Sequence, residues 1–198
     1  MRTAFVLTTN ENSERSQFSK HILENVGFIV RFFNCVPHSN KVLSNKHSML
    51  QIYETISNED AEWAYVFEDD INILMPIGIS EIIEYEQLTP TFFYLGICLP
   101  YYFTEQNRID YSKEINGTKV YGIRGAVRGL HAIGISKTGA RLLLDFSKNF
   151  ESFEYMDMIL EEFSQINPAP VVRMDLESYI SGHQGIFFQD RNRFPSSI

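Results

Sequence analysis

Trp63-Ala64-Tyr65-Val66-Phe67-Glu68-Asp69-Asp70 is an unbroken apolar run that stops at three adjacent carboxylates. Five consecutive apolar residues bounded by charge are typical of a strand buried on both faces, as in a parallel sheet covered by helices. The acids then lie at the carboxyl end of the strand, where ligands bind in open α/β sheets. Clustered carboxylates repel one another unless a cation compensates them, and their oxygens suit Mg²⁺ or Mn²⁺. The segment predicts a metal site, and its alternative interpretation is a solvated acidic turn after a strand.

Segments of strand type and helix type alternate around this run. Phe18, Ile22 and Val26 lie four residues apart, which places them on one face of a helix. The expected elements, in order, are a strand at 4–7, a helix from about Ser13 that Gly27 ends, a strand at 28–33, a helix with an apolar stripe over 49–56, and the strand at 63–67. This order predicts a βαβαβ beginning.

The second half continues the alternation with one interruption. Asn116-Gly117 between two strand-like runs favours a hairpin with a type I′ turn. The other expected elements are a strand at 92–95, a strand at 130–135, a helix at 137–146 with Ser136 as its N-cap, and a helix at 156–163. We therefore expect an α/β protein with a mixed, mostly parallel sheet, helices on its faces and a small β-hairpin added to it.

The composition limits the class of protein. A chain of 198 residues with 44% apolar content can bury one substantial core, so we expect a single domain over residues 1–198. Seventeen basic and twenty-five acidic residues give a net charge of −8, which disfavours nucleic acid or an anionic membrane as the main partner. No apolar stretch approaches the length of a membrane span. Cys35 and Cys98 are expected to be buried free thiols, which favours a cytoplasmic protein.

The chain also lacks the glycine-rich motifs of other nucleotide-binding sheets. Neither Gly-x-Gly-x-x-Gly after the first strand nor Gly-x-x-x-x-Gly-Lys occurs, so neither a dinucleotide fold nor a P-loop is supported. A sheet that binds a nucleotide through a metal ion instead looks like the GT-A class of nucleotide-sugar glycosyltransferases.

Four motifs give this resemblance a family. The motifs are Phe5-Val6-Leu7 with Arg15 downstream, Tyr65-Val66-Phe67-Glu68-Asp69-Asp70, Tyr94-Leu95-Gly96, and the run from His131 to Ala140. In the order of these motifs the chain resembles glycosyltransferase family 25, the lipooligosaccharide and collagen-type enzymes, and it is similar to small virus-encoded glycosyltransferases. One departure is that Asn45-Lys46 stands where the family usually has Ser-His.

The resemblance implies a reaction and a cofactor. A GT-A-type, Rossmann-like domain would transfer a sugar from a UDP- or GDP-sugar, with UDP favoured, to a hydroxyl of a carbohydrate or of a glycoprotein glycan. Mn²⁺ or Mg²⁺ would bind the diphosphate, and inversion at the sugar is expected because family members are inverting. Two rivals stay open: a metal-dependent nucleotidyltransferase or phosphoesterase, and a non-catalytic module that binds carbohydrate or metal.

The donor side of the expected site is assigned as follows. Asp70 is the first metal ligand, and His183, in a Gly-flanked polar segment, is the candidate second ligand. Glu68 or Asp69 would hold the ribose, as the resemblance implies. The remaining donor-binding candidates are Thr8, Thr9 and Asn10, which could contact the base and ribose or simply cap the next helix, and Arg15 and Lys46, which could neutralise phosphate or be solvated.

Asp157 is the expected catalytic base. Inversion needs one carboxylate that takes a proton from the attacking hydroxyl while the nucleotide diphosphate leaves. Asp157 occupies the position where the family shows an Asp after its earlier motifs. Its alternative role is electrostatic, because an acid in the first turn of a helix stabilises the helix dipole.

Overall fold

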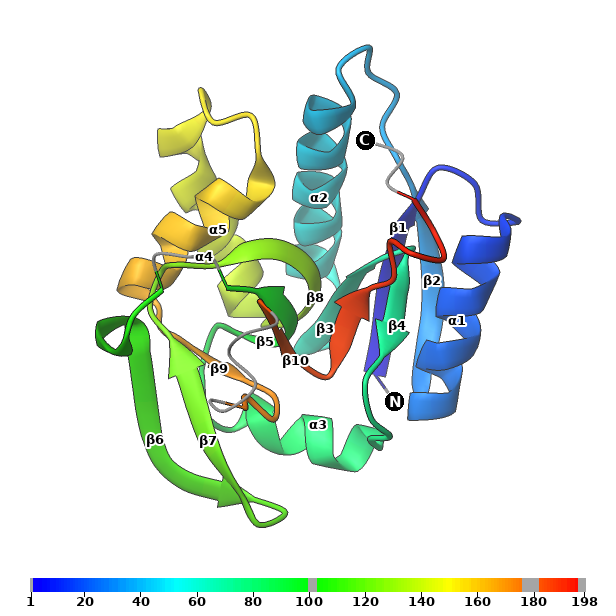
Figure 1. The fold of residues 1–198 in the computed structure, drawn as a ribbon. Coiled ribbons are helices and arrows are strands. Elements are labelled where there is room, and N and C mark those ends of the chain that lie inside the picture. Colours follow the sequence, from blue (N-terminus) through cyan, green and yellow to red (C-terminus); the bar gives the residue numbers. More distant parts are fainter. Residues whose placement is uncertain (1, 100–102, 176–181, 196–198) are drawn as a thin grey trace.

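The structure is a computed structural model that describes residues 2–99, 103–175 and 182–195. Its core is a nine-stranded mixed sheet in the order β2-β1-β3-β8-β5-β9-β7-β6, with β10 paired to β5 (Figure 1). Strands β1, β2, β3, β5 and β9 run in the same direction, and β8 lies antiparallel between β3 and β5. The strand bounds are β1 Arg2–Thr8, β2 Phe28–Asn34, β3 Trp63–Glu68, β5 Phe92–Cys98, β6 Arg108–Ile115, β7 Thr118–Ile123, β8 Arg128–Ser136, β9 Ala169–Val171 and β10 His183–Gly185.

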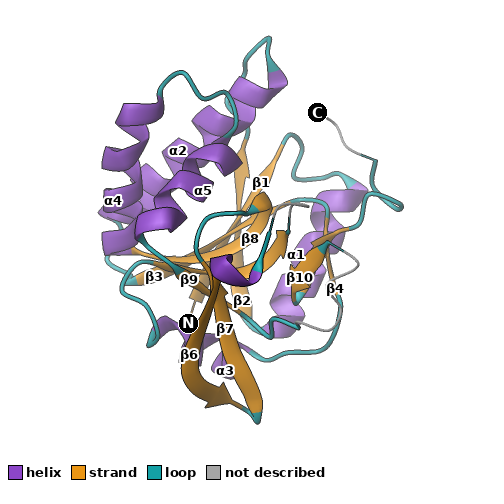
Figure 2. Ribbon diagram, turned by 60° about the vertical axis from the view of Figure 1, so that its left-hand side comes forward, coloured by secondary structure: helices purple, strands orange, loops and turns teal. Residues whose placement is uncertain are grey.

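Helices cover both faces of this sheet, as the apolar runs predicted. In β1, Phe5 and Leu7 pack with α2, α4 and α5, whereas Ala4 and Val6 pack with α1 and α3. Figure 2 shows α2, α4 and α5 together on one side of the sheet. The helix bounds are α1 Glu14–Val26, α2 Lys41–Asn58, α3 Ile79–Glu86, α4 Lys137–Ser147 and α5 Met156–Ile166. The expected fold class, a mostly parallel sheet flanked by helices, is confirmed.

The predicted helix ends at Ser13, Gly27 and Ser136 and the predicted hairpin turn at Asn116-Gly117 are also confirmed. Ser13 caps α1 with its side chain, and Gly27 ends the helix with a φ of 111°, a conformation that glycine adopts at little cost. Ser136 caps α4 through a hydrogen bond from the Gly139 backbone N–H. Asn116 and Gly117 have φ values of 49° and 77°, so both central residues of the β6–β7 turn have the positive φ of a type I′ turn.

The sequence did not predict how the C-terminal segment returns to the sheet. A second, two-stranded sheet joins β4 (Ile71–Ile73), just after the acids, to β11 (Phe187–Gln189). Gly96 allows this return, because a Cβ there would lie 2.2 Å from the carbonyl oxygen of Phe187. The return brings residues 187–193 to the end of β3, which the separation in sequence does not reveal.

Two smaller expectations concern the thiols and the membrane. Cys35 and Cys98 are free, as expected, but they are half-buried rather than fully buried. In the described ranges, no helix combines the length and apolar character needed to cross a membrane.

Candidate active site

Three neighbouring cavities lie around the carboxyl end of β3, and we call them together the cleft. Their volumes are about 480, 300 and 740 Å³, and we call them the first, second and third cavities. Glu68 and Asn45 line both the first and the second cavity, and Asp157 lines both the second and the third. Gln189 and Arg191 line all three. The three cavities therefore share walls at the end of β3.

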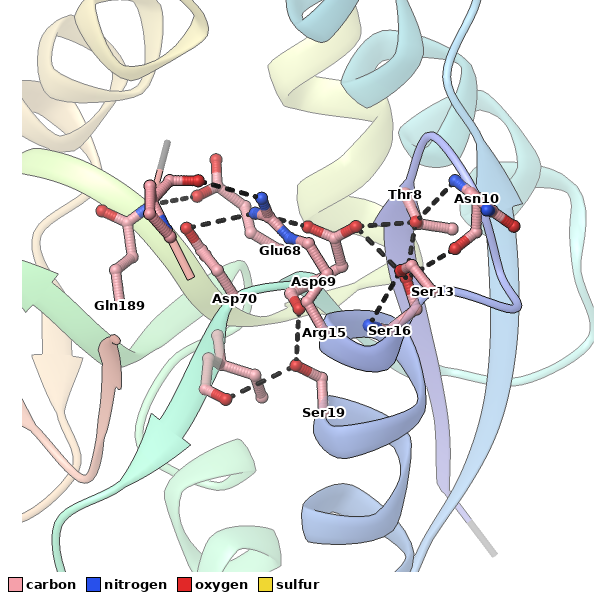
Figure 3. A network of polar contacts seen from close by, with 12 residues as sticks. Thr8, Asn10, Ser13, Arg15, Ser16, Ser19, Glu68, Asp69, Asp70 and Gln189 are labelled. Carbon is pink, nitrogen blue, oxygen red and sulfur yellow. Dashed lines mark hydrogen bonds and ion pairs between the residues drawn. The ribbon is translucent and has the colours of Figure 1, made fainter. Parts of the chain in front are cut away.

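Asp69 lines the first cavity, and both of its carboxylate oxygens and its backbone carbonyl have polar partners (Figure 3). Its Oδ2 accepts hydrogen bonds from the hydroxyls of Thr8, at 2.6 Å, and Ser16, at 3.3 Å. Its Oδ1 lies 2.7 Å from the Arg15 guanidinium, and its backbone carbonyl accepts a bond from the Ser19 hydroxyl at 2.8 Å. These contacts use the carboxylate fully, so Asp69 is suited to fixing the geometry of the end of β3.

Asp70 is buried as well, yet half of its carboxylate is unused. Its Oδ2 lies 3.3 Å from Arg15, whereas its Oδ1 has no hydrogen-bond partner among the residues that the structure describes. The residue is 4% exposed, and this burial raises the pKa of Asp70 against the opposing effect of Arg15. The Nε of Arg15 is also buried without a partner in the described chain. One unused acceptor and one unused donor therefore belong to the same ion pair.

Glu68 separates the first cavity from the second. Its carboxylate accepts a hydrogen bond from the Gln189 side chain, and Arg191 in turn donates to the Gln189 Oε1 at 3.0 Å. Removal of the Glu68 carboxyl from water, together with the charge of Asp70, raises the pKa of Glu68 to about 8. Glu68 is thus largely protonated at neutral pH in this state of the protein.

Gln189 and Arg191 were missed at the sequence level. They reach the cleft because the Asp190 N–H donates to the Asp70 carbonyl at 2.8 Å beside the β4–β11 pair. Ser16 and Ser19 were missed too, although the spacing of three residues from Ser13 to Ser16 to Ser19 marks one polar helix face.

Asp157 lies in the first turn of α5, across the second cavity from the end of β3. Its Oδ1 is buried and makes no hydrogen bond within the described part of the chain. A buried acceptor without a partner is costly in a folded protein unless a ligand satisfies it. Asp157 therefore has the position and the free oxygen that a base facing the second or third cavity would need.

Of the residues predicted to bind the donor, Thr8, Thr9 and Arg15 line the first cavity, whereas Asn10 and Lys46 do not. Asn10 is exposed and makes local bonds, accepting from the Asn12 N–H and donating its own N–H to Thr8. Lys46 points away from the cavity, because its Nζ donates to two backbone carbonyls next to α5. Arg15 is present but is paired with Asp69 and Asp70.

His183 lies on the wall of the third cavity. Its Nδ1 is 3.4 Å from the Cys98 sulfur, and its ring is near those of His131 and Phe188. Over residues 2–99, 103–175 and 182–195, no group of three or more His, Cys, Asp or Glu side chains is arranged to hold a metal ion. The metal site and its second ligand stay predictions, and Mg²⁺ in particular is often held by one or two carboxylates with phosphate oxygens and water.

Comparison with known proteins assigns no family. No protein-family profile matches the chain, and no curated protein sequence matches it. A crystal structure of a protein from STIV is 14% identical, with 82% of this chain and 78% of that chain covered and a TM-score of 0.40. CTP:phosphocholine cytidylyltransferase from Streptococcus pneumoniae is 12% identical over 96% of this chain and 93% of that chain, with a TM-score of 0.46. A UDP-glucose pyrophosphorylase complexed with UDP-glucose is 11% identical over 91% and 79%, with a TM-score of 0.47. At these levels the similarities identify neither a family nor an activity.

Proposed function

We propose that this protein is a metal-dependent glycosyltransferase that moves a sugar from a nucleotide-diphosphate sugar to a carbohydrate hydroxyl. The observation that carries the proposal is the pair of unused atoms at the end of β3. Asp70 Oδ1 is an acceptor suited to a cation, and Arg15 Nε is a donor suited to an anionic oxygen. A divalent cation bound to a diphosphate would satisfy both atoms, because the cation would bind Asp70 Oδ1 and a diphosphate oxygen would accept from Arg15 Nε.

The charges around the first cavity support the same ligand. Lys41 and Arg191 also line this cavity, but Arg15, the cation at the end of β3, is already paired with Asp69 and Asp70. A diphosphate at the end of β3 would therefore need a further cation. Asp70 would hold the cation, with diphosphate oxygens and water completing its shell. Mn²⁺ or Mg²⁺ would supply the charge that neutralises the diphosphate as it leaves.

The first cavity suits a nucleoside in size and lining. Its volume of about 480 Å³ lies in the range of small-molecule sites. Val36 and Pro37, from the loop after β2, give it an apolar wall on which a base could pack, and Thr9 and Ser44 add hydroxyls. We assign the nucleoside to this wall and the diphosphate to the end of β3.

The second and third cavities would take the acceptor. Asp157 would remove the proton from the acceptor hydroxyl as its oxygen attacks the anomeric carbon. The bond from that carbon to the diphosphate breaks in the same step, so the sugar is inverted. Arg191, which lines all three cavities, would contribute positive charge to the leaving diphosphate.

The activity assay uses UDP- and GDP-sugars, a panel of oligosaccharide acceptors, and either Mn²⁺ or EDTA. We expect nucleoside diphosphate release and an acceptor heavier by one sugar, both abolished by EDTA and by Asp70→Asn. Asp145→Asn is the matched control, because Asp145 is an exposed acid on α4 whose ion-pair partner among the described residues is Lys148.

Other outcomes would assign the site differently. Consumption of a nucleoside triphosphate with pyrophosphate release, and no acceptor glycosylation, would indicate a nucleotidyltransferase. Nucleotide-sugars that stay intact with every acceptor after long incubation, although they bind, would indicate a binding module.

A further inference from the structure

Lys46 is a buried cation of α2 that donates hydrogen bonds to the backbone of another segment. The residue is 6% exposed, and its Nζ donates to the backbone carbonyls of Glu151, at 3.0 Å, and Phe153, at 2.6 Å. Both carbonyls lie between the short helix η2 (Lys148–Phe150) and α5. Burying an ammonium group is costly unless it is hydrogen-bonded, and the same holds for the carbonyls. Lys46 therefore ties segment 151–155 to α2.

The tied segment leads directly into the cleft. Tyr155 is its last residue, Met156 and Asp157 follow it, and all three line the second cavity. Tyr155 is at the N-cap position of α5 but makes no side-chain capping bond, so the start of this helix lacks its usual local fixation. The two hydrogen bonds from Lys46 to the Glu151 and Phe153 carbonyls fix the residues just before α5 instead.

The other side of α2 borders the first cavity. Lys41, Ser44 and Asn45 line that cavity, and Asn45 lines the second as well. Figure 2 shows α2 beside α4 and α5. A tie from α2 to segment 151–155 therefore fixes one half of the cleft relative to the other.

We infer that Lys46 is a positioning residue for the acceptor half of the site. It fixes segment 151–155 and through it the place of Asp157 relative to the bound donor. The inference rests on the proposed function, and it gives Lys46 a role different from the phosphate contact that the sequence predicted. A small displacement of a catalytic group can cost orders of magnitude in rate, so the tie should matter for turnover.

Lys46→Met is the direct test, and Lys137→Met is its matched control. Lys137 also donates its Nζ to a backbone carbonyl, that of Glu59 just after the end of α2, but it lines none of the three cavities. We expect Lys46→Met to lower kcat roughly 10–100-fold and to raise the acceptor KM, with the donor Kd unchanged. Lys46→Arg keeps a buried donor and should restore most of the turnover, whereas Lys137→Met should alter only thermal stability.

Hydrogen exchange gives a readout that does not need activity. Amides of residues 151–157 should exchange faster in Lys46→Met than in wild type or Lys137→Met. If Lys46→Met does not fold, Lys46→Gln, which keeps a shorter donor, takes its place in both measurements.

The outcomes separate this inference from the proposed function. Wild-type protein that transfers no sugar would overturn the proposed function, and exchange would still decide whether Lys46 fixes the segment. Unchanged exchange at 151–157, or wild-type kcat and acceptor KM in a folded Lys46→Met protein, would overturn the role of Lys46.

Discussion

The end of β3 and the start of α5 each present an acid with an unused oxygen, but the two regions hold their acids differently. At the end of β3, side chains of α1 and β1 surround Asp69 and fix the neighbouring Asp70. At the start of α5, the Oδ1 of Asp157 has no hydrogen-bond partner among the residues that the structure describes, and Lys46 ties the preceding segment 151–155 to α2. The first region is suited to binding the cation and diphosphate in a fixed position, whereas the second is suited to orienting the Asp157 carboxylate toward the acceptor.

The largest expected effect comes from Asp157, the acid with fewer hydrogen-bond partners among the described residues. Asp157→Asn keeps the volume of the side chain but removes its basicity, so turnover should fall by something like 10²–10⁴-fold with donor affinity unchanged. Slow donor hydrolysis should fall too, because water in the acceptor position needs the same base. Steady-state kinetics with calorimetry of the donor checks this. Full turnover with a lower melting temperature would instead assign Asp157 to helix stability.

The next effect concerns a histidine that burial keeps uncharged. His131 in β8 donates from Nε2 to the Phe187 carbonyl at 3.0 Å, and burial lowers the pKa of His131 to about 4. Between pH 6.5 and about 4 the unfolded chain binds this proton and the folded chain does not, so stability falls as the pH falls. The loss should total about 3 kcal/mol.

Urea unfolding of wild type and His131→Gln across this pH range isolates that contribution. The difference in the free energy of unfolding between the two proteins should change by about this amount, and exposed His21→Gln is the control substitution. A wild-type curve parallel to that of His131→Gln would show that His131 does not titrate in this way.

A smaller effect tests the shell around Asp69. Thr8→Val keeps the shape of the side chain but removes the hydroxyl that donates to Asp69 at 2.6 Å. We expect a loss of about 1–3 kcal/mol in the free energy of unfolding, because a buried carboxylate loses a partner. Thr3→Val, on the same strand but partly exposed, is the control. Equal stability of Thr8→Val and wild type would mean that the shell does not fix this region.

The smallest effect is at the junction of the cavities. Arg191→Gln removes a charge that lines all three cavities and leaves the Arg15–Asp70 ion pair in place. The affinity for nucleoside diphosphate should fall by about tenfold and depend less on salt. Exposed Arg124→Gln is the control, and calorimetry at two salt concentrations measures both. Equal losses in the two variants would point to a general effect of charge.

The same comparison shows what the sequence could predict. Short-range signals sufficed for the end of β3, because one apolar run, its three acids and the polar turn after β1 are each continuous in sequence. Parallel pairing of β1 with β3 then brings them together. Arg15 lines the first cavity and is paired with Asp69 and Asp70, and the phosphate contact expected of it stays a prediction.

Contacts between residues far apart in the sequence determine the rest of the cleft, and local sequence patterns do not predict such contacts. Gln189 and Arg191 arrive through the pairing of β11 with β4, more than a hundred residues earlier in the chain. Lys46 looked like a helix-surface cation because its partners are backbone carbonyls, which carry no sequence signal. The antiparallel position of β8 was likewise not visible, because buried parallel and antiparallel strands have similar apolar runs.

The most direct test of the cation–diphosphate site at Asp70 and Arg15 is calorimetry of UDP and GDP binding in Mn²⁺ and in EDTA. Wild-type protein should bind at least one of them with Mn²⁺ and lose roughly 100-fold or more in affinity with EDTA, whereas folded Asp70→Asn should bind weakly in both. Asp145→Asn should behave as wild type. Binding of equal strength with and without the cation, or undiminished Mn²⁺-dependent binding by Asp70→Asn, would contradict the assignment.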